Sequence, residues 1–505
     1  MSIIEKGIAS IAPQWAVKRL AARHAIQAYE AAKPTRTFKP KRETRSADLA
    51  LQMSGLSLRE QARYLDENHD IVTGLFDRLE ERVVGGSGIG VEPLPISLTG
   101  EVHTEFAAEI KAAWSEWSLR PETAGELSRP QMERLICRTW LRDGEALAQI
   151  VQGKVQYYEH LTKVPFALEL LEPDYLPLNL NDPNKGIVQG IERNQWRRIR
   201  AYHIYKQHPG HGHGYWTDTK RVDADSVIFI ANRKRLGQNR GVPLLHASLV
   251  RLAEIKDYEE SERVAARISA ALAMYIKKGN SDMYHPPQTA DAQDRTFQIA
   301  PGIVFDTLAP GEEVGMIESN RPNTFLESFR NGQLRAIAAS TRSAYSTIAR
   351  NYNGTYSAQR QELVEAQLGY DLLQHEFIDY WCRPVYRKWL AMAIASGELE
   401  VPVDVDGASI FSAVYKGPVM PWINPSHEAS AWEVLVQAGF ADEAEVARAR
   451  GRNPQELKQS REAEIKTNRE KELVFSSDAF HKYYGKKEVQ SAAADPTDDA
   501  AKGHD

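Results

Sequence analysis

A helical pattern runs from Pro243 to about Lys278 and predicts one helix of roughly 35 residues, which at ~1.5 Å per residue is about 50 Å long. No small globular core requires a helix of that length. Helical periodicity returns from Asn323 to about Ala349 and again from Ser357 to about Ile394. We expect Pro384 to kink the last of these helices, because proline lacks an amide proton and crowds the preceding turn.

A different pattern lies between Glu145 and Ile230. Short runs rich in β-branched and aromatic residues alternate there with Gly, Pro, Asn and Asp, which predicts a mixed or antiparallel β region. On the N-terminal side, Ser57 and Glu60 have the spacing of a capping box, so ordered structure is expected to begin near Ser57. A helix is also predicted from about Thr104 to Trp117, and a helical pair over Glu428–Gln459. The fold class is therefore α+β.

Composition excludes several classes of protein. The formal net charge of −5 on 505 residues gives no global basic signature, so any DNA contact should be local. The two cysteines, Cys137 and Cys382, are too few for a disulfide scaffold or a thiolate zinc cluster and fit assembly in a reducing cytoplasm. No apolar run approaches the ~20 residues that span a bilayer, so we expect no membrane partner.

Two motifs resemble sites for chemistry, and the sequence argues against both. In VVGGSGIG, residues 83–90, a dinucleotide fingerprint would need glycine at Val91, and the run follows a helix, so a helix C-cap and turn is the better interpretation. The second is a group of imidazoles that could bind a transition metal. Glycines make their loop flexible, and Asp218 is the only carboxylate near them in sequence, so no metal site is predicted. The histidines are His203, His208, His211 and His213.

No catalytic centre is predicted either. Cys137 lies in ERLICRTWL, an apolar helix face, which favours a buried thiol over a nucleophile. Ser340, Ser343 and Ser346 lack the G-x-S-x-G pattern, and there is no Walker A sequence. We therefore expect no enzymatic activity and no cofactor.

The loop between the second and third long helices is more informative. It reads TIARNYNGTY, residues 347–356. Arg350 can contact phosphate, and the neutral polar side chains around it can hydrogen-bond without demanding a base sequence. A plain surface loop is the alternative, in which the tyrosines only pack the loop against the rest of the fold. The candidate nucleic-acid residues are Arg342, Arg350, Asn351, Tyr352, Asn353, Thr355 and Tyr356.

Four segments in order resemble the lambda family of phage portal proteins. They are GQNRGVPLL (237–245) running into KDYEESERVAARISAALAMYI, then STIARNYNGTYSAQR (346–360), WCRPVYRKWL (381–390), and the stretch from WINPSHEASAW to REAE (422–464). Each is moderately specific alone, and together their order and separation fit the family over roughly residues 45–475. The basic arm, with ten Lys and Arg against three acids in residues 1–46, and the His-rich loop are unlike any shared motif.

The resemblance implies a portal-type fold that assembles as a ring, typically of twelve subunits. The parts it implies are a basic mobile arm (1–49), a wing (50–242), stem helix 1 (243–278), a clip (279–322), stem helix 2 (323–344), a tunnel loop (345–356), a long kinked helix and wing return (357–424), crown helices (425–475) and a disordered tail (476–505).

The same resemblance implies a function at one vertex of the capsid in the virion. Double-stranded DNA would pass through the ring during packaging and ejection, after assembly in the host cytoplasm. The implied partners are further copies of the chain, the terminase large subunit, a head-completion or adaptor protein, and the major capsid and scaffold proteins. The acidic run at Asp257–Glu262, placed near a channel, would discourage tight phosphate binding. The main alternative is a structural head or adaptor protein that does not contact DNA, and a nuclease is a distant third.

Overall fold

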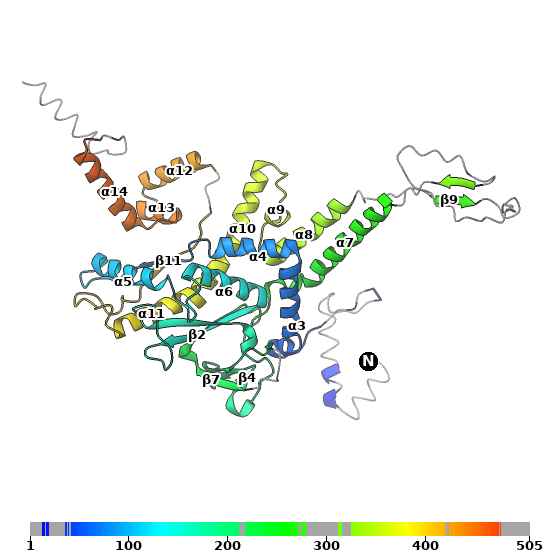
Figure 1. Cartoon of the computed structure of the whole chain (residues 1–505), viewed down its shortest axis with the longest axis horizontal. Helices are drawn as coiled ribbons and strands as arrows, with labels where there is room; N and C mark the ends of the chain where they lie inside the picture. Colours follow the sequence, from blue (N-terminus) through cyan, green and yellow to red (C-terminus); the bar gives the residue numbers. More distant parts are fainter. Residues whose placement is uncertain are drawn as a thin grey trace, which may run out of the picture. The chain divides into compact units, whose positions relative to one another are not determined.

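The packing of the computed structural model divides the chain into two units, Met1–Ser54 and Gly55–Asp505 (Figure 1). The structure describes residues 13–15, 17–19, 36–37, 39, 42–211, 218–271, 275–278, 312–315, 325–420, 424–473 and 475. In the first unit, residues 13–15 and 17–19 are helical, and α3 (Ala47–Asn68) begins there and continues into the second. Most of the predicted arm 1–49 and all of the predicted tail 476–505 lie outside the described residues.

The start of α3 corrects the prediction that ordered structure begins near Ser57. The helix starts at Ala47, where the Ser46 hydroxyl accepts a hydrogen bond from the Leu49 amide at 3.2 Å. Ser57 lies inside the helix, and its hydroxyl accepts from the Gln61 side chain at 3.0 Å. The capping pattern misled because serine and glutamate at that spacing also occur within helices, where their side chains point to solvent.

Helices form one side of the core of the second unit. The apolar stripe of α4 (Asp70–Val83) is buried, and the chain then turns at Gly85 and Gly88, which both have φ of 74°. The predicted C-cap and turn are confirmed, as is the predicted helix α5 (Thr104–Trp117). α6 (Arg129–Asp143) begins with a capping box between Ser128 and Gln131. None of the helices in the described ranges combines the length and apolar content that crossing a membrane requires.

The predicted β region consists of antiparallel sheets. β2 (Glu145–Gln152) pairs with β3 (Phe166–Leu171) on one side and β8 (Val227–Ala231) on the other. A second sheet has the order β4-β5-β6-β7, with bounds Ile187–Val188, Ile191–Arg193, Ile199–Tyr205 and Thr219–Asp223. The predicted run KVQYYE contributes only an isolated bridge between Val155 and Tyr158. Short 3-10 turns occur at η2 (Pro173–Tyr175), η3 (Pro183–Lys185) and η4 (Ala224–Ser226).

Both faces of the three-stranded sheet are buried. Alternate side chains of β2 point to opposite faces, so Ala146, Ala148 and Ile150 pack into the helical core, whereas Leu147 packs with apolar residues of the second sheet. The register places Leu147 opposite Leu171 and Phe229. A small third sheet joins β1 (Gly90–Pro93) to β11 (Ala413–Lys416), far apart in sequence.

The prediction of one helix from Pro243 to Lys278 is wrong at both ends. Residues Leu244–Ala247 form a 3-10 turn, η5, and α7 occupies only Leu249–Ala271. At the far end, β9 (Tyr275–Lys278) pairs with β10 (Glu312–Gly315). Periodicity could not separate helix from strand there, because a short apolar run fits both. Apart from 312–315, the predicted clip 279–322 lies outside the described residues.

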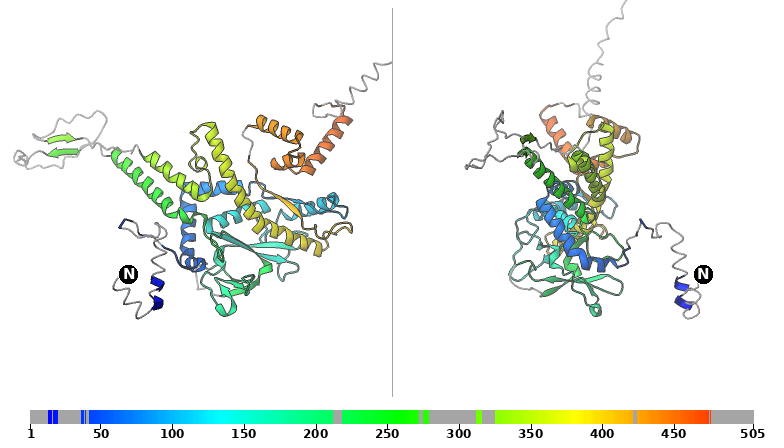
Figure 2. Two further views of the ribbon diagram at one scale, coloured as in Figure 1. Left: turned by 180° about the vertical axis from the view of Figure 1, so that it is seen from behind. Right: turned by 90° about the vertical axis from the view of Figure 1, so that its right-hand side faces the viewer.

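The remaining helices follow in order. α8 (Leu326–Thr341) runs beside α7 (Figures 1 and 2). The predicted continuous helix 323–349 is wrong, because Arg342 adopts φ of 58° and ends α8, and α9 (Tyr345–Ala349) is separate. One helix with a kink at Pro384 was predicted here. The structure has α10 (Tyr356–Phe377) and α11 (Arg383–Ala395), with a π-helical turn (η6, Ile378–Cys382) between them just before that proline. A helical pair was predicted over Glu428–Gln459, but the structure has three helices that extend further, α12 (Pro425–Gln437), α13 (Glu443–Ala449) and α14 (Pro454–Glu470).

Candidate nucleic-acid interface

The candidate site is the connection from α8 to α10. Arg342 caps the C-terminus of α8 and Arg350 caps that of α9, and both arginines adopt the left-handed conformation, with φ of 58° and 51°. The residues predicted as one loop, 345–356, therefore contain a short helix, and the irregular part is 350–355. Thr355 then caps α10, and its hydroxyl accepts a hydrogen bond from the Ala358 amide at 3.4 Å.

The base of this loop is anchored to its surroundings. The Ser346 amide donates a hydrogen bond to the Glu362 carboxylate at 3.0 Å, which joins α9 to α10. The Arg335 guanidinium lies 5.0 Å from the centre of the Tyr345 ring, a distance that suits a cation–π contact. A Cβ at Gly369 would lie 2.9 Å from the Arg342 carbonyl oxygen, so α10 approaches the chain closely at that residue. These contacts hold the loop in a defined place.

The tip of the loop is ordered by its own polar groups. The Asn351 side chain accepts a hydrogen bond from the Asn353 amide at 3.0 Å and donates one to the Tyr345 hydroxyl at 3.5 Å. The Gln359 side chain donates to the Tyr352 carbonyl. Tyr352 and Tyr356 are 58% and 56% exposed, so neither ring packs the loop against the rest of the described chain.

The cations of the site differ in their surroundings. Arg350 is exposed and forms no ion pair with any described residue, so its guanidinium can contact an incoming anion. Arg342 is half-buried. Burial of the neighbouring Lys234 ammonium lowers the pKa of that group, and the positive charge of Arg342 lowers it further. The seven predicted residues are close in sequence and lie in the connection from α8 to α10, with Arg350, Tyr352, Asn353, Thr355 and Tyr356 exposed.

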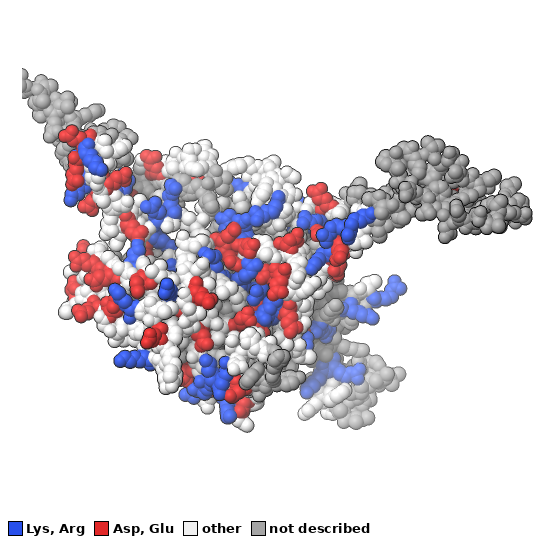
Figure 3. Space-filling model, in the orientation of Figure 1, with Lys and Arg blue, Asp and Glu red and all other residues white. Residues whose placement is uncertain are grey.

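The face of the chain that Figure 3 draws carries both signs of charge. On the face drawn in Figure 3, Lys and Arg are interspersed with Asp and Glu over the body of the chain. A surface with mixed charge does not bind a long stretch of phosphate backbone tightly, because tight binding requires many positive charges close together. Any DNA contact on that face must therefore depend on a few local groups.

The residues considered for catalysis are held in structural roles. Cys137 and Cys382 are buried free thiols, and burial raises the pKa of both well above the ordinary value, which opposes thiolate formation. The Ser340 hydroxyl donates to the Ile337 carbonyl at 2.9 Å. The prediction that Cys137 is a buried core residue is confirmed.

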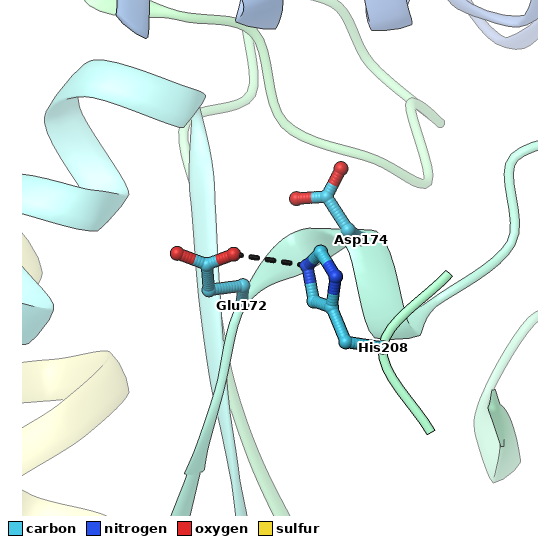
Figure 4. Close-up of side chains that lie close together, drawn as sticks. All are labelled: Glu172, Asp174 and His208. Carbon is cyan, nitrogen blue, oxygen red and sulfur yellow. Dashed lines mark hydrogen bonds and ion pairs between the residues drawn. The ribbon is translucent and has the colours of Figure 1, made fainter. Parts of the chain in front are cut away.

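The histidine-rich segment acquires carboxylate neighbours that the sequence did not reveal. Figure 4 shows His208 beside Glu172 and Asp174, and its Nε2 lies 3.1 Å from the Glu172 carboxylate. Ligand atoms of these three residues lie within 4.8 Å of one another. His203 lies 3.5 Å from the carboxylate of Glu192, while His213 lies outside the described residues. The sequence alone could not indicate that these residues meet, because Glu172 and His208 are 36 positions apart.

Two arginines make this group a poor cation site. Arg63 hydrogen-bonds to the Asp174 carboxylate and lies 3.9 Å from that of Glu172. Arg59 lies 3.5 Å from Asp174. A divalent ion bound among the three ligands would meet two fixed positive charges, so the arrangement stabilises the fold electrostatically and does not favour a metal.

Comparisons with known proteins place the chain among similar sequences. The family model described as phage portal protein, lambda family, matches residues 33–374. The chain is 22% identical over 452 residues to a probable portal protein of Halomonas phage phiHAP-1, covering 84% of this chain and 85% of that protein.

Several solved structures are similar to the chain at low sequence identity. The neck of an empty gene transfer agent particle, computed with C6 symmetry, covers 79% of this chain and 94% of its own at 14% identity and a TM-score of 0.40. The neck of the native particle, computed with C12 symmetry, gives 13% identity over 78% and 92%, with a TM-score of 0.39. An HK97 family phage portal protein from Corynebacterium diphtheriae gives 14% identity over 64% and 85%, with a TM-score of 0.26.

Proposed function

The chain belongs to the lambda family of phage portal proteins, and on that premise we propose that it forms the ring through which the viral genome enters and leaves the capsid. The ring is expected to contain twelve subunits and to occupy one vertex of the virion. The protein acts as a conduit and docking platform and catalyses no reaction itself. Assembly takes place in the host cytoplasm.

An uncovered apolar stripe supports assembly into a ring. α10 buries one apolar side, with Ala366, Tyr370 and Leu373, within its own chain. On the other side, Val364, Leu368 and Leu372 follow one another at helical spacing and are 43%, 68% and 48% exposed. A helix with two apolar sides is stable in water when both are covered, and a neighbouring subunit would cover the second.

The observation that carries the DNA-conduit proposal is the exposed loop 350–355. Its base is anchored by α9 and α10, and its tip presents Arg350 among neutral polar and aromatic side chains. Repeated around a ring, one arginine per subunit gives a circle of weak phosphate contacts. Weak contacts suit moving DNA, because a tightly bound phosphate would raise a barrier to translocation.

The other proposed partners follow from membership of the family. The terminase large subunit docks on the clip during packaging, and a head-completion or adaptor protein takes its place afterwards. The major capsid and scaffold proteins surround the ring during assembly. Of the segment between α7 and α8, the structure describes β9 and β10, which pair with each other.

Negative-stain microscopy of the purified chain tests the ring directly. Closed rings with a central hole are the expected result, and multi-angle light scattering should give their mass. Only monomers at micromolar concentration and low salt would contradict the proposal. Rings that support head assembly but transmit no DNA would favour the structural head or adaptor protein.

A further inference from the structure

One face of α7 is exposed, acidic and bordered by valines. Glu254, Asp257 and Glu260 lie three residues apart, which places them on one side of the helix with Val250 and Val264. All five are exposed, the valines at 69% and 37%. Arg251 lies three residues before Glu254 and Arg263 lies three residues after Glu260, so the two arginines flank this side of the helix. The Arg251 guanidinium donates a hydrogen bond to the Gln333 side chain at 2.7 Å, and none of the three carboxylates forms an ion pair with a described residue. We call these five residues the acidic face.

Two loops of the same chain form a patch of the opposite charge. The loop after β8 exposes Arg233, Lys234, Arg235 and Leu236, and the turn between β5 and β6 exposes Trp196 and Arg198. Leu236 and Trp196 are almost completely exposed, at 104% and 90%. We call these six residues the basic patch.

The basic patch is held in a defined shape. The Arg197 guanidinium donates a hydrogen bond to the Gly237 carbonyl at 2.6 Å, which ties the two loops together across 40 positions of sequence. Within the second loop, the Gln238 side chain accepts from the amides of Lys234 and Arg235 at 3.0 and 3.1 Å. A preorganised surface loses little conformational freedom on binding, so it is suited to recognition.

We propose that the acidic face of one subunit binds the basic patch of the next subunit in the ring. This inference rests on the proposed ring, in which a head-to-tail contact joins two different surfaces of identical chains. Three carboxylates meet a surface of four cations, and the valines at the ends of the acidic face pack against Trp196 and Leu236. The charges set the register of neighbouring subunits, while burial of the apolar side chains supplies affinity.

The apolar members of both surfaces favour a protein partner over DNA. A phosphate backbone would satisfy the cations but would leave Leu236 exposed, with no apolar surface to cover it. The acidic face has matching charge and matching apolar ends, and every copy of the chain supplies it. A second copy therefore accounts for both surfaces.

A charge-reversal experiment with two variants tests the contact. The first variant carries Glu254→Lys, Asp257→Lys and Glu260→Lys, and the second carries Arg233→Glu, Lys234→Glu and Arg235→Glu. Each variant alone places like charges at every contact, so ring assembly should require more than about tenfold higher concentration than for the unmodified chain. An equimolar mixture restores opposite charges at every contact of an alternating ring, so rings should reappear in mass photometry and negative stain.

The matched control reverses three exposed carboxylates at another place, Glu101→Lys, Glu105→Lys and Glu109→Lys, and should assemble normally. Thermal unfolding of the separate variants checks that each is folded. If the unmodified chain forms no ring, the proposed function itself fails. If it forms rings and both reversed variants do so equally well, or if mixing restores nothing, only the proposed contact is overturned. A patch variant that assembles normally but loses binding to a short DNA duplex would assign the basic patch to DNA and overturn the contact as well.

Discussion

Arg240 and Glu145 form an ion pair that solvent does not reach. The Nε of Arg240 donates to both carboxylate oxygens of Glu145 at 3.0 Å, and both side chains have 0% exposure. Arg59 of α3 and the Gly241 amide donate to the same carboxylate at 3.0 and 2.8 Å. One carboxylate on β2 thus joins α3 to the loop that leads into η5 and α7, and this explains a buried arginine in the segment GQNRG.

We predict that Glu145→Ala lowers the free energy of unfolding by ~3–5 kcal/mol, because it leaves Arg240 and Arg59 buried without their shared partner. Urea unfolding followed by circular dichroism measures the change. Asp379→Ala removes the partner of Arg383 in an ion pair whose side chains are 59% and 47% exposed. That control should cost about 1 kcal/mol or less. Equal losses of unfolding free energy in the two variants would show that burial does not determine how much an ion pair contributes to stability.

Replacing two glycines with alanine should change the stability of the chain in opposite directions. A Cβ at Gly241 would lie 1.9 Å from the Gly144 carbonyl oxygen, so the backbone must move and we expect a loss of about 1–3 kcal/mol or more. Gly332, in α8, has nothing within 4 Å of the same position. Gly332→Ala should stabilise the chain by about 0.5–1 kcal/mol, because glycine loses more conformational freedom than alanine in a helix. Melting curves of the two variants measure both effects, and a stable Gly241→Ala variant would contradict the close backbone approach.

Local patterns predicted the elements whose formation depends on neighbours in sequence. The helical pattern over Thr104–Trp117 predicted α5 with the bounds that the structure shows, and the glycines in residues 83–90 predicted the end of α4. The missing amide proton of Pro384 predicted a kink, and the π-helical turn η6 lies just before that residue. Each of these signals acts over one or two turns of chain, which is the range over which periodicity and capping are informative.

Pairings between distant residues could not be predicted in the same way. β1 meets β11 with Gly90 opposite Lys416, and His208 meets Glu172, because the tertiary fold brings them together. Nothing local distinguishes those partners from other residues of the same type. The overestimated length of α7 has the same cause, since β9 is a strand only because β10 lies beside it. The loop predicted at 345–356 begins with a helix, α9, and the irregular part is only 350–355. The contact between Ser346 and Glu362, which joins α9 to α10, also links residues that no local pattern pairs.

The ion pairs of Asp174 predict a loss of stability in acid. Burial alone would raise the pKa of this carboxyl, but the charges of Arg59 and Arg63 outweigh it and hold the pKa below the ordinary value of 3.8. For a carboxyl whose pKa is lower in the folded state, the stabilisation is complete above the unfolded pKa and is lost as pH falls through the folded pKa. We expect Asp174→Asn to cost about 1–3 kcal/mol at pH 7, as for hydrogen bonds to charged groups.

The pH dependence of that cost separates ionisation from packing. The difference between the unmodified chain and Asp174→Asn should stay constant from neutral pH to about pH 5 and then shrink below about pH 4. Urea unfolding at several pH values measures it. A difference of the same size at acid and neutral pH would mean that the carboxylate charge contributes nothing.

The exposed arginine of the candidate loop makes the last prediction. Arg350→Ala should leave ring assembly and terminase docking intact, because the side chain is exposed and forms no ion pair within the described chain. Completion of packaging or retention of the genome should be impaired, and Arg120→Ala, another exposed arginine, should have no such effect. Each exposed contact contributes about 1 kcal/mol or less, so the loss becomes visible only because every subunit of the ring carries the change. The yield of particles that hold full-length DNA measures this loss. The affinity of the variant ring for DNA should also depend less steeply on salt concentration, since fewer counterions are released on binding. Normal packaging and retention by Arg350→Ala and by a chain lacking Asn351–Gly354 would mean that this loop does not handle DNA.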